Sequence, residues 1–269
     1  MITRIDHIVI GVQDLDQAVA DYETLGFTVV PGGTHTGGET HNALIGFADG
    51  TYLELIAFIG PSATSDHRWR AAIASGEGVI DFAVGTDDAE TEAARIADEG
   101  APNGGAVDGG RERPDGQRVA WRNLVVPGAR ELGAPFIIED RTPRELRVPS
   151  GPDAMHPGGF QAVDGLTVVV GDLQTARRLF TTMLDDDGVE VEPSVAGAAT
   201  GAEGGGTYRF SVGDQWVELV TPDERNSRLV MALNERGPAV YTVVLRTSDR
   251  SFAGEDMRLT HGVRFELKQ

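Results

Sequence analysis

The sequence predicts an α+β protein built from repeated units, each with a strand, a helix and two or three further antiparallel strands. Two stretches carry the repeat: residues 6–18 read DHIVIGVQDLDQA, and residues 164–176 read DGLTVVVGDLQTA. In both, an apolar strand runs into a polar turn with aspartate and then into an amphipathic helix. Short alternating strands follow each helix, so the unit mixes helices with antiparallel strands.

The first unit occupies the start of the chain. Residues 6–12 form an apolar strand, and Asp14 is placed to cap the helix that follows, because its carboxylate can accept a free backbone N–H of the first turn. Gly26 stands where this helix should have ended. Strands over about 39–47 and 51–58 follow and are joined by an Asp-Gly turn.

The second unit is a weaker copy of the first. The stretch VIDFAVGTDD at 79–88 predicts a strand and a turn, and a helix over about 88–99 follows. The glycine- and proline-rich stretch APNGGAVDGGRERPDG at 101–116 predicts a long loop inside this unit.

The third unit begins with the second clear stretch of the repeat. Asp172 is its expected helix N-cap, and Gly188 lies beyond the helix. Strands at 207–212 and 215–220 complete it. A fourth unit starts at Val240 with VYTVVLRTSD, but too few residues remain for a whole copy, so it must be truncated.

A Pro- and Gly-rich linker at 143–159 divides the chain into two predicted domains. The first covers residues 1–150 and the second covers residues 158–269. Their modules are expected at 1–58 and 78–142 in the first domain, and at 160–221 and 238–269 in the second.

The composition excludes several classes of protein. The chain has 269 residues and no cysteine, which excludes disulfides, thiolate metal sites and cysteine nucleophiles. The N-terminus lacks the pattern of a signal peptide, and no apolar run approaches the roughly 20 residues of a membrane span. A soluble, cytoplasmic protein is therefore expected.

Charge is the unusual bulk property. The chain has 42 acidic residues against 23 lysines and arginines, for a net charge of −19, and Lys268 is its only lysine. Such a surface repels nucleic acid and anionic membranes, so neither is an expected partner. Simple solubility would explain the charge, but we favour adaptation to high salt, where ions screen the repulsion between acids.

Two strands place polar side chains where a cavity is expected. In strand 6–12, alternation puts His7 opposite the aliphatic row that packs on the helix. In TYLELIAF at 51–58, Glu54 lies opposite the row of Leu53, Leu55 and Ala57. A carboxylate in such a strand should be protonated, paired or bound to a cation. The same reasoning selects Asp81, Glu139 and Glu218.

These features resemble the modules of the vicinal-oxygen-chelate superfamily. A strand opening with histidine, a helix, and a late strand with "ELI" are similar to its βαβββ modules, and GGTHTGGETHNALIGFADGTYLELIAF resembles its glyoxalase-like domain proteins. The superfamily includes glyoxalase I, extradiol dioxygenases, methylmalonyl-CoA epimerase and antibiotic-resistance proteins. The resemblance implies paired modules that close into cup-shaped mixed sheets, in two such domains.

The resemblance also implies a metal site in the first cup. Position by position, the ligands would be His7, Glu54, Asp81 and Glu139, with Asp81 standing where many relatives have histidine. One imidazole and three carboxylates suit Mn²⁺, Fe²⁺, Ni²⁺ or Mg²⁺, with Zn²⁺ possible. Glu54 or Glu139 could then move a proton as the catalytic residue. In the second half the histidine position is Gly165, so no metal site is expected there.

Other polar residues could line the cup. His41, Arg111, Arg113, Trp121 and Arg122 are candidate substrate-binding residues, with a satisfied core histidine and solvated arginines as the alternatives. The remaining histidines are read as surface or loop residues: His35, His67, His156 and His261.

Two functions of different class remain open. The first is a metal-dependent lyase, isomerase or dioxygenase acting on a small oxygen-rich molecule such as a dicarbonyl, a hydroxy acid or a catechol. The second is a metal-free protein that binds or sequesters a small molecule, as resistance proteins of this superfamily do. Four modules in one chain make a monomer plausible, and a homodimer remains open.

Overall fold

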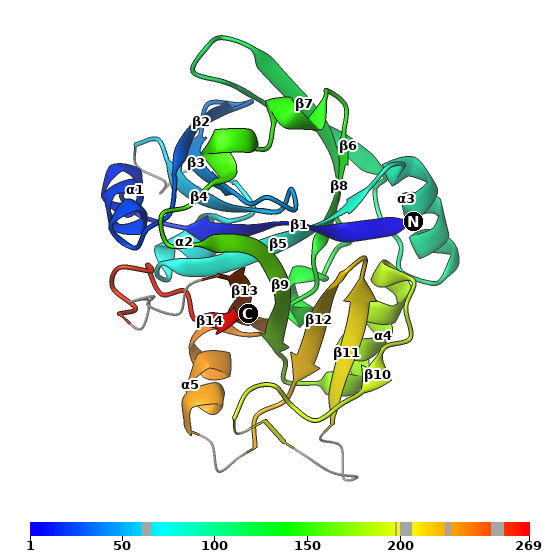
Figure 1. Ribbon diagram of the computed structural model, residues 1–269. Coiled ribbons are helices and arrows are strands. Elements are labelled where there is room, and N and C mark those ends of the chain that lie inside the picture. Colours follow the sequence, from blue (N-terminus) through cyan, green and yellow to red (C-terminus); the bar gives the residue numbers. More distant parts are fainter. Residues whose placement is uncertain (61–65, 197, 200–205, 224–226, 249–255) are drawn as a thin grey trace.

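The computed structural model describes residues 1–60, 66–196, 198–199, 206–223, 227–248 and 256–269 (Figure 1). Its strands form two sheets, one closed into a barrel and the other open. The closed sheet has the order β1-β4-β3-β2-β6-β7-β8-β5. Its strands are β1 (Ile2–Gly11), β2 (Val30–His35), β3 (Thr40–Gly46), β4 (Tyr52–Phe58), β5 (Gly78–Thr86), β6 (Ala106–Glu112), β7 (Arg118–Leu124) and β8 (Phe136–Asp140).

The closed sheet consists of two copies of one unit. The first runs from β1 through helix α1 (Leu15–Thr24) to β2, β3 and β4, and the second runs from β5 through α3 (Ala89–Asp98) to β6, β7 and β8. In each copy the first strand pairs in parallel with the last, and β1 and β5 pair antiparallel at the centre. The short helix α2 (Arg70–Ala74) connects the copies.

The open sheet contains the third unit and a partial fourth. Its order is β10-β11-β12-β9-β13-β14. The elements are β9 (Phe160–Val169), α4 (Leu173–Leu184), β10 (Val189–Glu190), β11 (Thr207–Val212), β12 (Gln215–Val220), α5 (Ser227–Arg236), β13 (Ala239–Thr247) and β14 (Phe265–Lys268). Part of the truncated fourth unit, residues 249–255, lies outside the described residues.

The expected strand faces are confirmed. In β1, Ile8 and Ile10 are buried in the main apolar core, while Val9 belongs to a separate cluster inside the closed sheet. In β4, Leu53 and Leu55 join the main core. Since successive side chains of a strand alternate, His7 and Glu54 turn to the inside of the closed sheet.

The helix starts also agree with the prediction. The carboxylate of Asp14 accepts the backbone N–H of Gln17, and that of Asp172 accepts the backbone N–H of Thr175. Asp88 caps α3 in the same way. One local sequence signal therefore starts a helix in three of the units.

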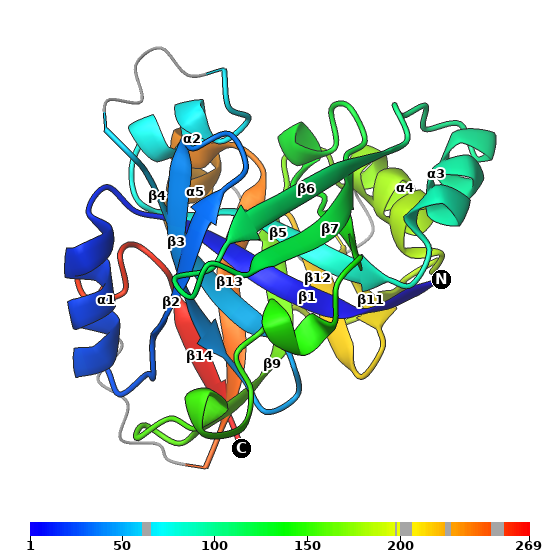
Figure 2. The same cartoon turned by 90° about the horizontal axis from the view of Figure 1, so that it is seen from above.

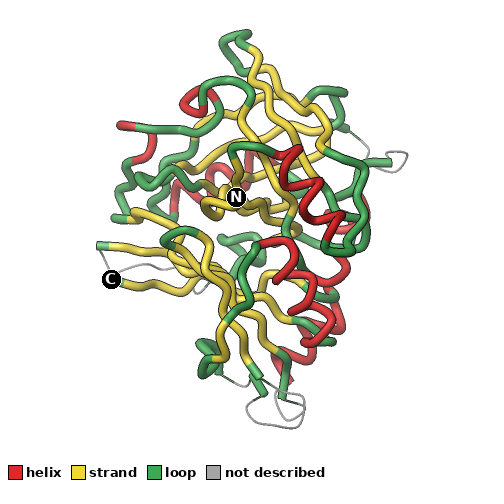
Figure 3. The backbone as a smooth tube through the Cα atoms, turned by 90° about the vertical axis from the view of Figure 1, so that its right-hand side faces the viewer, coloured by secondary structure: helices red, strands yellow, loops and turns green. Residues whose placement is uncertain are grey.

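The two sheets pack on each other over a continuous core. Its buried residues come from both halves, among them Ile5 and Phe82 in the first and Leu166 and Leu245 in the second. The Gln215 side chain accepts a hydrogen bond from the backbone N–H of Ile5 and so ties β12 to β1. Helices α3 and α4 lie side by side at one end (Figures 2 and 3), where Arg95 donates to backbone carbonyls at the end of α4.

Strands β2 and β6 were not expected from the sequence. Residues 101–116, expected to be a loop, contain β6, which pairs with β7 along seven residues and with the end of β2. Neither β2 nor β6 has a continuous apolar face, because both have glycine pairs in their centres. Among the described residues, no helix is long and apolar enough to cross a membrane.

Candidate functional site

The inside of the closed sheet forms a cup with a cavity of about 250 Å³. Its walls are unusually aromatic: Tyr52, Trp69, Trp121 and Phe136 all line it. Polar groups from β1, β2, β3 and β4 gather on one side, and Arg111 of β6 and Asn123 of β7 also line the cavity. An apolar wall with a few convergent polar groups is the usual composition of a small-molecule site.

Glu54 is the centre of the polar side. Its Oε1 accepts a hydrogen bond of 2.6 Å from Asn42 and lies 3.4 Å from Nε2 of His35, and its Oε2 lies 3.6 Å from Nε2 of His7. Burial alone would raise the pKa of Glu54, but the hydrogen bond and charge of His35, then His7 and Asn42, lower it to about 2. Glu54 is thus a buried carboxylate held in the ionised form.

His7 is held from both sides. Its Nδ1 lies 2.8 Å from Oδ1 of Asp6, and its ring stacks on Tyr52 with 4.6 Å between centroids. Asp6 is in turn bound by Arg147, whose guanidinium also bonds the hydroxyl of Tyr52 and the carboxylate of Asp140. Burial would raise the pKa of Asp6, but Arg147 and the His7 hydrogen bond hold it well below its usual value. The imidazole therefore has little rotational freedom.

Asp81 does not join the His7–Glu54 group. Its Oδ2 is bound by the guanidinium of Arg68 at 2.5 Å and by the indole N–H of Trp69 at 2.8 Å. Burial raises the pKa of Asp81 in spite of the Arg68 charge. Its carboxylate anchors two residues of the cup wall, which differs from the ligand role that the resemblance implied.

Glu139 lies outside the cup. Its Oε2 accepts the backbone N–H of Ala89 at the start of α3, and its Oε1 pairs with Arg141. An anion at a helix N-terminus is favourable, so this contact stabilises α3. The structure thus places the Glu139 carboxylate at the start of α3, apart from His7 and Glu54.

The candidate substrate-binding residues divide into two groups. Arg111 and Trp121 line the cup. His41 does not, because its neighbour Asn42 takes the inward position on β3. Arg113 bonds the carbonyl of Leu146 and the carboxylate of Asp115 instead of reaching the cup. Arg122 pairs on the outside with Asp108 and Glu90.

All four histidines read as surface or loop residues have more specific places. His35 ends β2 in the cup wall, and His67 also lines the cup. His156 is buried and bonds the backbone of Thr28 and Gly46. His261 is buried between Glu77 and Asp21. His35 is the main functional candidate that sequence reasoning missed, since VPGGTH has no apolar alternation to predict a strand.

The four implied ligands do not form a metal site. His7 and Glu54 meet, but Asp81 is taken by Arg68, and Glu139 lies on the other face of its strand. Throughout the part of the chain that the structure describes, no group of three or more acidic or histidine side chains could hold a metal ion. The two imidazoles near Glu54 approach different oxygens of that carboxylate. The donor set therefore does not fit the family's divalent metal.

The cup contains two buried acceptors that the protein leaves unsatisfied. Among the described residues, no donor reaches Oδ1 of Asn42 or Oδ1 of Asn123, although both amides line the cavity. Gly32 packs so closely on the Asn42 amide that any side chain there would collide with Oδ1. A buried acceptor without a donor costs about 1–3 kcal/mol, so each of these oxygens would gain from a hydrogen-bond donor.

In the open sheet, Gly165 and Glu218 stand at the positions that correspond to His7 and Glu54. Gly165 packs under the indole ring of Trp216, and a side chain at position 165 would collide with that ring. Glu218 is buried but fully paired, with Arg209 at 2.6 Å and the hydroxyl of Ser194 at 2.6 Å. Glu218 is thus paired within the protein, and position 165 has no room for a histidine.

The family model of the glyoxalase-like domain matches residues 5–184. A search of curated proteins finds no match. Among solved structures, the chain is similar to a hypothetical protein from Staphylococcus aureus, with a TM-score of 0.70 and 15% identity over 98% of this chain and 99% of that one.

Two further solved structures are similar in fold. A triple mutant of 4-hydroxymandelate synthase from Streptomyces coelicolor has a TM-score of 0.60 and 15% identity, over 92% of this chain and 72% of that one. A xylose isomerase-like TIM barrel/4-hydroxyphenylpyruvate dioxygenase fusion protein has a TM-score of 0.55 and 13% identity, over 93% of this chain and 37% of that one. At such identities the likeness shows the fold alone.

Proposed function

The chain belongs to the glyoxalase-like domain family, and on that premise we propose that it binds a small planar organic molecule in the cup of the closed sheet, without a divalent metal. The ligand donates N–H or O–H groups to Asn42 and Asn123. Its flat body lies against the aromatic wall. This is the metal-free alternative among the functions that the sequence left open.

The observation that carries the proposal is the pair of unsatisfied amide oxygens. Asn42 Oδ1 cannot be relieved by rotating the amide, because its NH₂ group is already committed to Glu54. Both oxygens of Glu54 already face protein groups, since Oε1 accepts from Asn42 and lies 3.4 Å from His35, and Oε2 lies 3.6 Å from His7. The two amide oxygens can therefore accept hydrogen bonds from the N–H or O–H groups of a bound molecule.

A metal-dependent lyase, isomerase or dioxygenase is the second candidate. One observation favours it: Nε2 of His7 faces a carboxylate while Nδ1 is held by Asp6, and metal-bound imidazoles are usually held in this way. Against it stands the donor set, which lacks a third ligand in the second unit.

Two measurements on protein purified without chelator decide between these functions. Elemental analysis is expected to find no stoichiometric Mn, Fe, Ni or Zn. Calorimetric titration is expected to detect binding of resorcinol, which has two O–H donors, and much weaker binding of 1,3-dimethoxybenzene, which has none. Stoichiometric metal would overturn the metal-free proposal and support the second candidate.

Matched variants locate the binding. Asn123→Ala removes one acceptor from the cup and is expected to weaken resorcinol binding about tenfold. Asn234→Ala changes an exposed asparagine on α5 and should leave the affinity unchanged. Equal affinity of the two ring compounds, or no effect of Asn123→Ala, would contradict the proposed role of the amide oxygens.

A further inference from the structure

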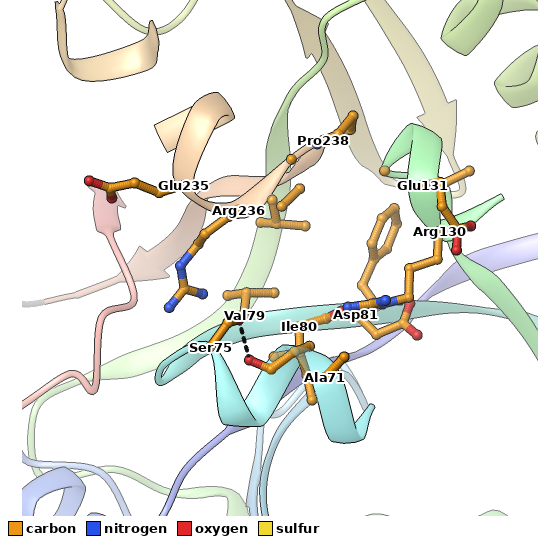
Figure 4. A pocket seen from close by; sticks show the side chains of 17 residues that line it. Ala71, Ser75, Val79, Ile80, Asp81, Arg130, Glu131, Glu235, Arg236 and Pro238 are labelled. Atoms are coloured by element: carbon orange, nitrogen blue, oxygen red, sulfur yellow. Dashed lines mark hydrogen bonds between the residues drawn. The ribbon is translucent and has the colours of Figure 1, made fainter. Parts of the chain in front are cut away.

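A second cavity, larger than the cup, lies between the two sheets. Its volume is about 380 Å³, and it is bounded by α2, β5, the 3₁₀ turn Arg130–Leu132, the end of α5 and the start of β13 (Figure 4). None of its walls comes from the polar side of the cup. It is therefore a separate site, and a ligand bound there does not depend on the function proposed for the cup.

The cavity has an apolar floor and two arginines. Val79, Ile80 and Val240 contribute to the floor. Figure 4 shows Arg130 and Arg236 on either side of Val79 and Ile80, with Glu235 directed away from them. An apolar floor flanked by guanidinium groups suits a molecule with an apolar body and an anionic end.

Neither arginine has a carboxylate partner among the described residues. Arg130 donates from Nε to the carbonyl of Ile80, and Arg236 donates to the carbonyl of Glu77. Neither contact neutralises the charge. Arg130 and Arg236 therefore bring two guanidinium groups without an ion pair to one cavity.

The backbone at one side is shaped to receive Arg236. A side chain at Gly78 would collide with the guanidinium, and Gly78 has a φ of 139°, which other residues rarely adopt. The carbonyl of Glu77 then orients the group from the same turn. Gly78, the first residue of β5, thus leaves room for the Arg236 guanidinium.

Three carboxylates line the cavity together with the two arginines: Asp81, Glu131 and Glu235. Asp81 reaches its floor, but this carboxylate is already bound by Arg68, which comes from the cup side. Arg130 contributes a second positive charge near the same carboxylate. Among the described residues, Glu131 and Glu235 form no ion pair with Arg130 or Arg236, which bond backbone carbonyls instead.

We propose that this cavity binds a small organic carboxylate with an apolar body, its carboxylate between Arg130 and Arg236 and its body on the floor formed by β5 and β13. Because Asp81 touches this cavity and also holds Trp69, occupation is expected to change the environment of that indole.

The test is calorimetric titration of the whole protein with octanoate, with octan-1-ol and inorganic phosphate as separate probes. Octanoate is expected to bind. Octanol, which lacks the charge, and phosphate, which lacks the apolar body, are expected to bind at least about tenfold more weakly. No binding of octanoate, or equal binding of octanol, would overturn the proposal.

Variants show where octanoate binds. Arg130→Gln and Arg236→Gln are expected to weaken octanoate binding about tenfold each. Arg118→Gln changes an exposed arginine at the start of β7 and should leave it unchanged. Ala71→Phe fills the cavity from an exposed position and should abolish binding even if an arginine variant folds poorly. Octanoate binding that survives Ala71→Phe and both arginine variants would place the ligand elsewhere.

Discussion

At the scale of single residues, Glu54 gives the clearest expectation. Its folded pKa of about 2 lies below the ordinary value of 4.5, because His35, His7 and Asn42 outweigh the effect of burial. The stability that this carboxylate contributes is therefore fully present above pH 4.5 and is lost as the pH falls towards 2. A shift of this size corresponds to about 3 kcal/mol.

Glu54→Gln removes this contribution. We expect urea unfolding at pH 6 to show the variant less stable than the parent by about 3 kcal/mol. The difference should shrink steadily when the measurement is repeated at lower pH, because the parent loses the same contribution on protonation. A difference that stays constant down to about pH 2.5 would show that Glu54 is not held as an anion.

Sequence reasoning succeeded at residues where a strand has one clearly aliphatic row. Such rows in β1 and β4 turned His7 and Glu54 towards each other. In β8 the row is ambiguous, since Ile137 and Ile138 are both apolar, and only the structure shows that Ile137 joins the main core. Glu139 shares the outer face with Ile137, so the sequence PFIIED alone could not show that its side chain faces away from the cup.

At the scale of elements, Arg147 joins three parts of the fold. It is buried after the 3₁₀ turn Arg144–Leu146 and bonds Asp6 on β1 and Asp140 at the end of β8. Its partners are far apart in the sequence, so no local sequence pattern could predict these contacts. Helix caps could be predicted because Asp14 and Asp172 act within three residues of themselves.

Arg147→Met breaks this connection and leaves Asp6 with fewer partners. We expect a loss of about 3–5 kcal/mol in the free energy of unfolding, because a buried charge loses its principal counter-charge. Arg122→Met is the control, since Arg122 pairs with exposed Asp108 and Glu90 and should cost no more than about 1 kcal/mol. Equal losses in urea titrations of the two variants would contradict the structural role of Arg147.

At the scale of the whole molecule, the repeat predicted two halves, and the structure shows how they share one core. The closed sheet spans residues 2–140 and the open sheet spans residues 160–268. Buried side chains of both belong to one apolar cluster. The Gly/Pro linker suggested a boundary, but the sequence could not show whether the halves pack together, because that depends on the outer rows of β1, β5, β9 and β13.

We expect the two halves to unfold together. Calorimetry should show a single transition whose van't Hoff and calorimetric enthalpies agree, because separating the halves would expose the shared core. Gln215→Ala removes the contact with the backbone of Ile5 and should lower the midpoint of this one transition. Two resolved transitions would show instead that residues 1–150 and 158–269 are independent domains.

The net charge of −19 gives an expectation for the molecule as a whole. Repulsion among surface acids acts over a distance of about 10 Å at 0.1 M salt but only about 3 Å at 1 M, so salt should stabilise the fold. In urea titrations the unfolding midpoint should rise between about 0.05 M and 1 M KCl. A control with Asp16→Asn, Asp98→Asn and Asp187→Asn combined removes three exposed charges and should reduce this rise. Full stability in dilute buffer, with no response to KCl, would favour simple solubility over adaptation to high salt.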